Sequence, residues 1–311
     1  PRPDKKIRFI STQTDEEVIF EIDGEIKFRQ GTWANYPASV LKRIILNFGP
    51  ELKGCDIAFD SNLPKASGMS SSSALMIASF FAISGVNDLQ NHAKYRENIH
   101  NKIDLAEYLA SIENGLTFRR LEGYKGVGTF GGSEDHTAII NCNSGKLAEY
   151  SYCPVKFKKE IELPADYSFV IGASGVHAVK TGNAMEQYNL ASDLVRSILL
   201  LWNNHHGTEF TDLNSAINSE PDAIVRIRDL IENFPVNGYT SSQLSDRFEQ
   251  FYAENYEIIP KSVKFLENGD VDAFGRMVDK SQKLTTELLK NQVEQTKFLA
   301  ASARKYGAVA A

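Results

Sequence analysis

The sequence is poor in cysteine, has no excess of basic residues and contains no long hydrophobic run. Its three cysteines, Cys55, Cys142 and Cys153, have spacings that match no metal or redox motif. Their odd number is typical of a reducing compartment, so we expect a cytoplasmic location. The formal net charge of −6 argues against a nucleic acid partner, because phosphate backbones bind clustered Lys and Arg. No apolar run reaches membrane-spanning length and no signal peptide begins the sequence, so we expect no membrane partner.

The rest of the composition is ordinary, with 42% hydrophobic and 24% charged residues in a chain of 311. A chain of this length forms one large or two medium domains. It begins at Pro1 without an initiator Met and ends on the short stretch 307–311. We therefore expect that both termini are truncated relative to a longer protein.

Hydrophobic periodicity predicts a mixture of strands and helices. Alternation over residues 7–28 predicts a β-meander, whose last segment is 26–28, and further strands are predicted at 57–59, 138–140 and 167–171. Helical spacing predicts helices in the following ranges: 40–48, 74–85, 99–118, 184–202, 223–234, 241–256, 262–266, 270–289 and 292–305.

The central motif is a loop of small residues with four consecutive serines, between the strand at 57–59 and the helix that follows. A serine at a helix start can cap the helix, and the remaining N–H groups and hydroxyls then face a volume at the positive end of the helix dipole. Such a volume suits a phosphate, whereas a flexible serine-rich linker would not be flanked by a strand and an apolar helix. The loop lacks the G-x-x-x-x-G-K-[ST] pattern of the common P-loop. The predicted phosphate-binding residues are Pro64, Lys65, Ala66, Ser67, Gly68, Met69, Ser70, Ser71, Ser72 and Ser73.

A second motif is the glycine-rich turn at 126–132, which has four glycines in seven residues and leads to Asp135. Glycines let the backbone fold tightly, and a rigid turn that presents one carboxylate is suited to hold an active-site base. The alternative is an Asp that only caps the turn.

Both motifs resemble those of the GHMP small-molecule kinases. The serine loop resembles their P-x-G-x-G-L-S-S-S-A sequence, with Met69 in place of Leu. The glycine turn resembles the G-x-x-x-G-G-x-x-D-Q segment of galactokinases, with His136 in place of Gln, and residues 33–36 resemble their W-x-N-Y segment. The chain departs from the galactokinase pattern at Gly175, at Asn189 and at 280–282.

The resemblance implies an α+β fold with the two-domain GHMP kinase architecture. Residues 1–165 would form a nucleotide-binding domain similar to ribosomal protein S5, and residues 166–311 a ferredoxin-like C-terminal domain. It also implies ATP as co-substrate and Mg²⁺ as cofactor. The implied roles are Asp135 as catalytic residue, the serine loop as ATP-binding segment, Ser72 and Glu113 as metal ligands, and Gly131, Gly132, Asp135, His177 and Tyr188 as substrate-binding residues. Without the resemblance, Glu113 would be taken for a solvated helix residue, and His177 for a structural one.

The function that the resemblance implies is ATP-dependent phosphorylation of a sugar hydroxyl, such as the anomeric 1-OH of galactose or a related sugar. Two alternatives stay open: a non-catalytic sugar or nucleotide sensor on the same fold, and a GHMP kinase acting on another small-molecule alcohol. We expect a monomer, although the sequence does not exclude an oligomer.

Overall fold

A computed structural model describes residues 1–29, 31–63, 68–176 and 183–311, without the side chains of 183–188. The described residues form two compact units. Unit 1 contains Pro1–Ser144, Tyr150–Phe157 and the first residues of helix α6, whereas unit 2 contains Gly145–Glu149, Lys158–Val176 and Glu186–Ala311. Helices and strands occur together, which confirms the predicted α+β class. The predicted domain division at 165/166 and the two domain names stay predictions.

The sheet of unit 1 has three strands in the order β2-β1-β3, namely β1 (Lys6–Ser11), β2 (Glu17–Glu21) and β3 (Cys55–Phe59). Strand β1 is antiparallel to β2 and parallel to β3. Its alternating pattern buries Ile7 and Phe9 on one face, as expected for a strand with a single covered face. The strand predicted at 57–59 is confirmed. A third meander strand at 26–28 is wrong: in the described chain this stretch is not a strand, although Ile26 is buried in the core.

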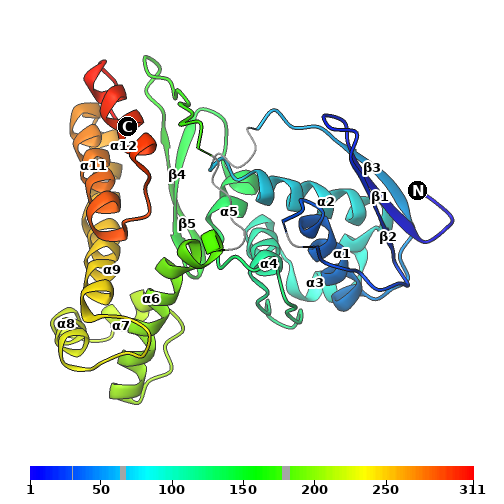
Figure 1. The fold of residues 1–311 in the computed structure, drawn as a ribbon, viewed down its shortest axis with the longest axis horizontal. Coiled ribbons are helices and arrows are strands. Elements are labelled where there is room, and N and C mark those ends of the chain that lie inside the picture. The colour runs from blue at the N-terminus through cyan, green and yellow to red at the C-terminus, as the bar shows by residue number, and fades with distance from the viewer. Residues whose placement is uncertain (30, 64–67, 177–182) are drawn as a thin grey trace. The chain divides into compact units, whose positions relative to one another are not determined.

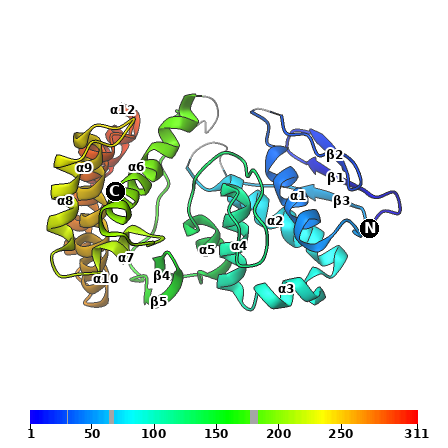
Figure 2. The same cartoon turned by 90° about the horizontal axis from the view of Figure 1, so that it is seen from below.

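Helices pack against one side of this sheet and build the core of unit 1 (Figures 1 and 2). The helical elements of unit 1 are α1 (Asn35–Phe48), α2 (Ser71–Asn87), η1 (Leu89–Asn91), α3 (Ala93–Asn98), α4 (Lys102–Asn114) and α5 (Glu134–Asn141). Fully buried residues from three of these helices, such as Leu41, Met76 and Leu109, meet Ile7 and Phe9 of the sheet. This shared core fixes the start of α2 and the end of α4, where the predicted site residues lie.

After α5 the chain forms a pair of strands, β4 (Lys146–Tyr152) and β5 (Val155–Glu162), and then an irregular segment. The strand predicted at 167–171 is wrong, because the structure describes no regular element there. Phe169, Val170 and Ile171 are 73%, 91% and 65% exposed. Residues of high β-propensity form a strand only where a neighbouring strand accepts their backbone hydrogen bonds.

Unit 2 is built mainly from helices. Its elements are the greater part of α6 (Asn183–His206), α7 (Leu213–Ile217), α8 (Ala223–Asn233), α9 (Ser241–Ala253), the π-helix η2 (Glu254–Ile258), α10 (Ile259–Glu267), α11 (Val271–Leu284), the π-helix η3 (Thr285–Leu289) and α12 (Glu294–Lys305). A second core, around Trp202, Ile227 and Phe248, joins α6 to α9. The helices predicted after residue 208 are confirmed, with small differences at their ends.

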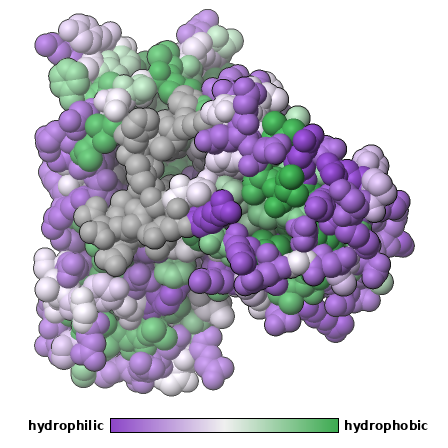
Figure 3. Space-filling model, turned by 45° about the vertical axis from the view of Figure 1, so that its right-hand side comes forward, coloured by the Kyte–Doolittle hydropathy of each residue, from purple (hydrophilic) through white to green (hydrophobic). Residues whose placement is uncertain are grey.

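Hydrophilic side chains cover most of the face drawn in Figure 3 and surround smaller hydrophobic patches. In the part of the chain that the structure describes, none of the helices combines the length and the hydrophobicity needed to cross a membrane.

Candidate active site

The start of helix α2 forms the first part of the candidate site. Gly68 and Ser70 both have positive φ angles, +75° and 51°, so the chain turns sharply before the helix. Ser70 is the N-cap residue, and its carbonyl oxygen accepts the N–H of Ala74 at 3.0 Å. The prediction of a serine cap is wrong for the described structure, because the side chain of Ser70 makes no capping hydrogen bond. The predicted ATP-binding residues Pro64, Lys65, Ala66 and Ser67 lie outside the described residues.

Ser73, in the first turn of α2, joins two carboxylates. Its hydroxyl lies 3.1 Å from Oε2 of Glu113 and 3.4 Å from Oδ2 of Asp135. Ser73 is 1% exposed and Glu113 is 7% exposed, so the contact between them is shielded from solvent, whereas the contact with Asp135 is part-buried. The structure therefore brings the serine loop, the end of α4 and the residue after the glycine turn into one place. Ser72 was the predicted metal ligand, whereas the described hydrogen bonds to Glu113 and Asp135 come from its neighbour Ser73.

Glu113 is held at the end of α4 by contacts on several sides. The hydroxyl of Thr129 donates to its Oε1 at 3.4 Å, in addition to the Ser73 contact. Arg43 of α1 is 1% exposed and donates to the backbone oxygen of Ser111 at 3.4 Å and to that of Leu116. A cation at the carbonyl end of a helix also interacts favourably with the helix dipole. Burial lowers the pKa of Arg43 below its ordinary value.

The glycine turn is anchored on the same helix end. The N–H of Val127 donates to the backbone oxygen of Glu113 at 2.9 Å, and Nδ2 of Asn114 donates to that of Gly131 at 3.3 Å. Gly126 has a φ of +38°, and a Cβ at this position would lie 2.4 Å from the backbone oxygen of Glu113. Only glycine permits this close approach. The turn that leads to Asp135 is therefore fixed against the helix that carries Glu113.

Asp135 lies in the first turn of helix α5, and this position corrects a prediction. Residues 138–140 were predicted as a strand, but they belong to this helix. Ala138, Ile139 and Ile140 form an apolar run too short to distinguish a strand from a helix. The two carboxylates at 134 and 135 favour a helix start, because they interact with its positive end. The helix packs on α4 and α2, and it carries Asp135 toward Ser73.

His136 is an unusual neighbour of these carboxylates. It is fully buried, its Nε2 lies 3.7 Å from Oε2 of Glu113, and neither ring nitrogen has a hydrogen-bond partner in the described structure. Burial lowers the pKa of His136 to about 4, and the charge of Asp135 opposes this shift only in part. The ring is therefore neutral near pH 7.

This burial predicts a loss of stability in acid. The pKa of His136 in the folded chain lies below its ordinary value. The unfolded chain therefore takes up a proton on this ring below about pH 6.5, whereas the folded chain does not bind it until about pH 4. The stabilisation is complete above pH 6.5 and is lost at about 1.4 kcal/mol per pH unit as the pH falls toward 4. Between pH 6.5 and 5, the free energy of unfolding measured in urea should fall by about 2 kcal/mol more in the wild type than in His136→Gln. Equal losses in both proteins would contradict the prediction.

The predicted substrate residues are only partly described. Gly131 and Gly132 lie in the turn before α5, next to Asp135 in the chain. His177 lies outside the described residues, and Tyr188 lies in α6 without a described side chain. The substrate roles of all these residues stay predictions.

The donor groups at the site fit a magnesium ion that is bound partly by protein side chains and partly by the phosphate oxygens of a nucleotide. In the described residues, no group of three or more His, Cys, Asp and Glu side chains is placed to hold a metal by itself. Glu113 and Ser73 offer one carboxylate and one hydroxyl at 3.1 Å from each other. Mg²⁺ is commonly bound through one or two carboxylates together with phosphate oxygens and water.

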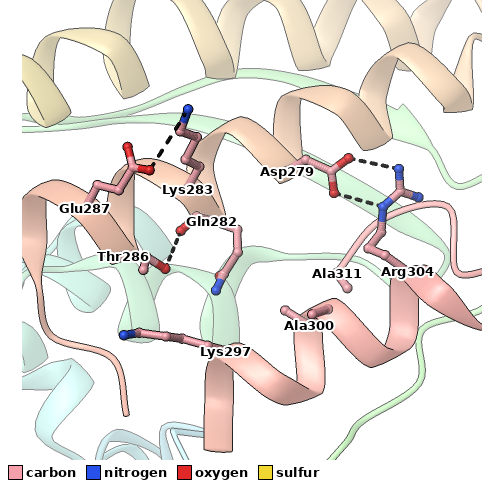
Figure 4. A pocket seen from close by; sticks show the side chains of 10 residues that line it. Asp279, Gln282, Lys283, Thr286, Glu287, Lys297, Ala300, Arg304 and Ala311 are labelled. Atoms are coloured by element: carbon pink, nitrogen blue, oxygen red, sulfur yellow. Dashed lines mark hydrogen bonds and ion pairs between the residues drawn. The ribbon is translucent and has the colours of Figure 1, made fainter. Parts of the chain in front are cut away.

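A cavity of about 270 Å³ lies elsewhere, within unit 2, between α11, η3 and α12 (Figure 4). Each cation in its wall has a carboxylate partner: Arg304 pairs with Asp279 at 2.8 Å, Lys283 with Glu287 at 4.0 Å, and Lys297 with Glu294 at 2.7 Å. None of the predicted site residues lines this cavity. Its cations are therefore compensated by ion pairs, so we do not assign it a role in the chemistry.

Comparison with known proteins shows which proteins this chain resembles. Residues 35–118, which contain the serine loop and Glu113, match the family of the GHMP kinases N terminal domain. The chain is 32% identical to galactokinase from Dictyostelium discoideum over 170 residues, which are 54% of this chain and 30% of that protein. It is 34% identical to galactokinase from Chloroflexus aggregans over 188 residues, which are 60% of this chain and 43% of that protein.

The fold is also that of a solved galactokinase. The crystal structure of Lactococcus lactis galactokinase complexed with galactose superposes with a TM-score of 0.73 at 21% identity, covering 98% of this chain and 70% of that one. The chain spans less than half of the length of the two curated relatives named above. The resemblance predicted from the serine loop and the glycine turn is therefore confirmed: the chain is similar to the GHMP kinases over residues 35–118, has galactokinases among its relatives, and has the galactokinase fold.

Proposed function

We propose that this chain acts as an ATP-dependent kinase that phosphorylates a sugar hydroxyl. The observation that carries the proposal is the hydroxyl of Ser73, which lies within 3.4 Å of both Glu113 and Asp135. This contact supports the proposal because it joins two carboxylates, one that could bind a metal and one that could act as a base, at the start of helix α2. Phosphoryl transfer depends mainly on such positioning and on electrostatic stabilisation.

Each residue has a separate part in this proposal. The loop at 64–73 binds the phosphates of ATP through backbone N–H groups and hydroxyls. Glu113, with Ser72 or Ser73, holds Mg²⁺, which neutralises charge on the transferred phosphoryl group when it is bound. Asp135 orients the acceptor hydroxyl and takes its proton. Gly131, Gly132, His177 and Tyr188 contact the acceptor.

The acceptor is proposed from the relatives. They are galactokinases, one of them solved with galactose, so galactose and related sugars are the first candidates. The departures at Gly175, Asn189 and 280–282 leave another sugar or small-molecule alcohol open. A cytoplasmic location fits the three free cysteines of the described structure.

The proposal is tested by measuring ATP consumption by the protein with Mg²⁺ against a panel of free sugars. We expect sugar-dependent release of ADP and a phosphorylated sugar, with galactose, arabinose and galacturonate in the first group tested. A chain that binds sugar or ATP without turnover is instead a sensor. A chain that binds neither overturns the proposal.

A further inference from the structure

Tyr152, the last residue of β4, lies directly over the glycine turn. A Cβ at Gly132 would lie 1.3 Å from its hydroxyl oxygen and 1.9 Å from its Cζ. Both residues belong to unit 1. Any side chain at position 132 would therefore displace the ring, so this arrangement requires glycine.

The turn under this ring is held on two sides. The hydroxyl of Ser133 donates to the backbone oxygen of Tyr152 at 3.4 Å, and Asn114 donates to that of Gly131 at 3.3 Å. Gly132 precedes Asp135 by three residues, and Asp135 lies 3.4 Å from Ser73. The backbone of Tyr152 is thus tied to the turn, and its ring lies beside the segment on which we place the acceptor hydroxyl.

The ring is not part of a core, because Tyr152 is 57% exposed. An exposed aromatic ring with a hydroxyl offers a flat apolar face and a polar end to a ligand. Sugars carry C–H groups on one face and hydroxyls around the ring, so they can use both features. Ligand sites in general combine aromatic walls with a few polar groups that fix orientation.

From this placement we propose that Tyr152 contacts the acceptor and helps to decide which sugars are used. The inference rests on the proposed kinase function, and nothing in the sequence motifs points to this residue. Because the hydroxyl already lies against Gly132, an acceptor that reaches the backbone of the turn meets the tyrosine ring as well. Substituents on that side of the sugar are accepted or rejected by this contact.

The test compares the Tyr152→Ala and Tyr152→Phe variants with the wild-type protein, with KM and kcat measured for ATP and for each accepted sugar. Tyr152→Ala should change kcat/KM by about tenfold or more for at least one sugar and reorder the preference among sugars. The KM for ATP should stay within about twofold, because the ring acts on acceptor binding. Tyr152→Phe removes only the hydroxyl, so it should affect only sugars that use that hydrogen bond.

Tyr306→Ala is the matched control, because Tyr306 is an 83% exposed tyrosine at the end of α12 in unit 2. It should change no sugar constant. Equal KM and kcat values for every sugar in wild type and Tyr152→Ala would overturn the inference. An equal fall in kcat/KM for all sugars and for ATP would overturn it as well.

Direct calorimetric binding of the same sugars separates this inference from the proposed function. If sugars bind without being phosphorylated, the kinase proposal fails, and the role of Tyr152 is decided by whether Tyr152→Ala changes their affinities. If no sugar binds to wild type, both proposals fail.

Discussion

Replacing Asp135 with asparagine should lower turnover by about 10²- to 10⁴-fold, the range typical of general acid–base catalysis. The amide keeps the shape of the side chain but cannot accept the proton of the acceptor hydroxyl. The contact with Ser73 at 3.4 Å can be kept by the amide oxygen, so the fold should be preserved. The KM for ATP should stay within about twofold, because the base acts on the acceptor rather than on nucleotide binding.

Glu134→Gln is the matched control for this measurement. Glu134 is the neighbouring carboxylate in the same helix turn, and its side chain is exposed. We expect it to retain nearly full turnover. If Asp135→Asn retains turnover, or if both variants lose it equally, Asp135 is not the base.

Replacing Glu113 with glutamine should have a comparably large effect, seen first in the metal requirement. Removal of groups that only support a metal ligand typically costs about 10- to 100-fold in metal affinity, so loss of a direct ligand should cost at least as much. Glutamine is similar in size to glutamate: its amide oxygen can accept the hydrogen bond from one of Ser73 and Thr129, and its NH₂ group can donate to the other hydroxyl. The Mg²⁺ concentration at half-maximal rate should therefore rise while the fold is kept.

Two further measurements make this test specific. Binding of Mn²⁺ in the presence of an ATP analogue, followed by electron paramagnetic resonance, reports the metal site without turnover. Thermal unfolding checks that the buried amide is tolerated, and Glu97→Gln, at an exposed helix position, serves as the control. Unchanged metal binding in Glu113→Gln would show that the metal is held elsewhere.

The sequence predicts the parts of the site better than their exact contacts. The serine loop and the glycine turn are recognisable because their composition is rare, and the structure brings them together through Ser73 and Asp135. The choice between Ser72 and Ser73 cannot be made from a motif alone. Neighbouring side chains on a helix differ in direction by about 100°, so a shift of one residue turns the hydroxyl away from Glu113.

Two of the wrong strand predictions share a physical cause. Residues 138–140 and 167–171 are short apolar runs, and such runs are compatible with several structures. In the first case the acidic residues before the run and the packing on α4 favour a helix. In the second, the structure describes no partner strand for the segment. Tertiary contacts decide both outcomes, and they are not visible in a local pattern.

Tyr152 shows what sequence reasoning misses entirely. It follows the glycine turn by 20 residues and belongs to no motif, and only the close approach to Gly132 draws attention to it. The requirement for glycine at 132 is a weak sequence signal, because a glycine-rich turn offers many other reasons for a glycine.

The buried guanidinium of Arg43 links helix α1 to the end of α4 that carries Glu113. It connects α1 to the carbonyl end of α4, two residues before the carboxylate of Glu113. Inherited or engineered changes on α1 that tilt this helix should therefore displace Glu113 and, on the proposed function, weaken magnesium binding, so that more Mg²⁺ is needed for the same rate. A survey of natural variants for altered activity should include this helix as well as the loops.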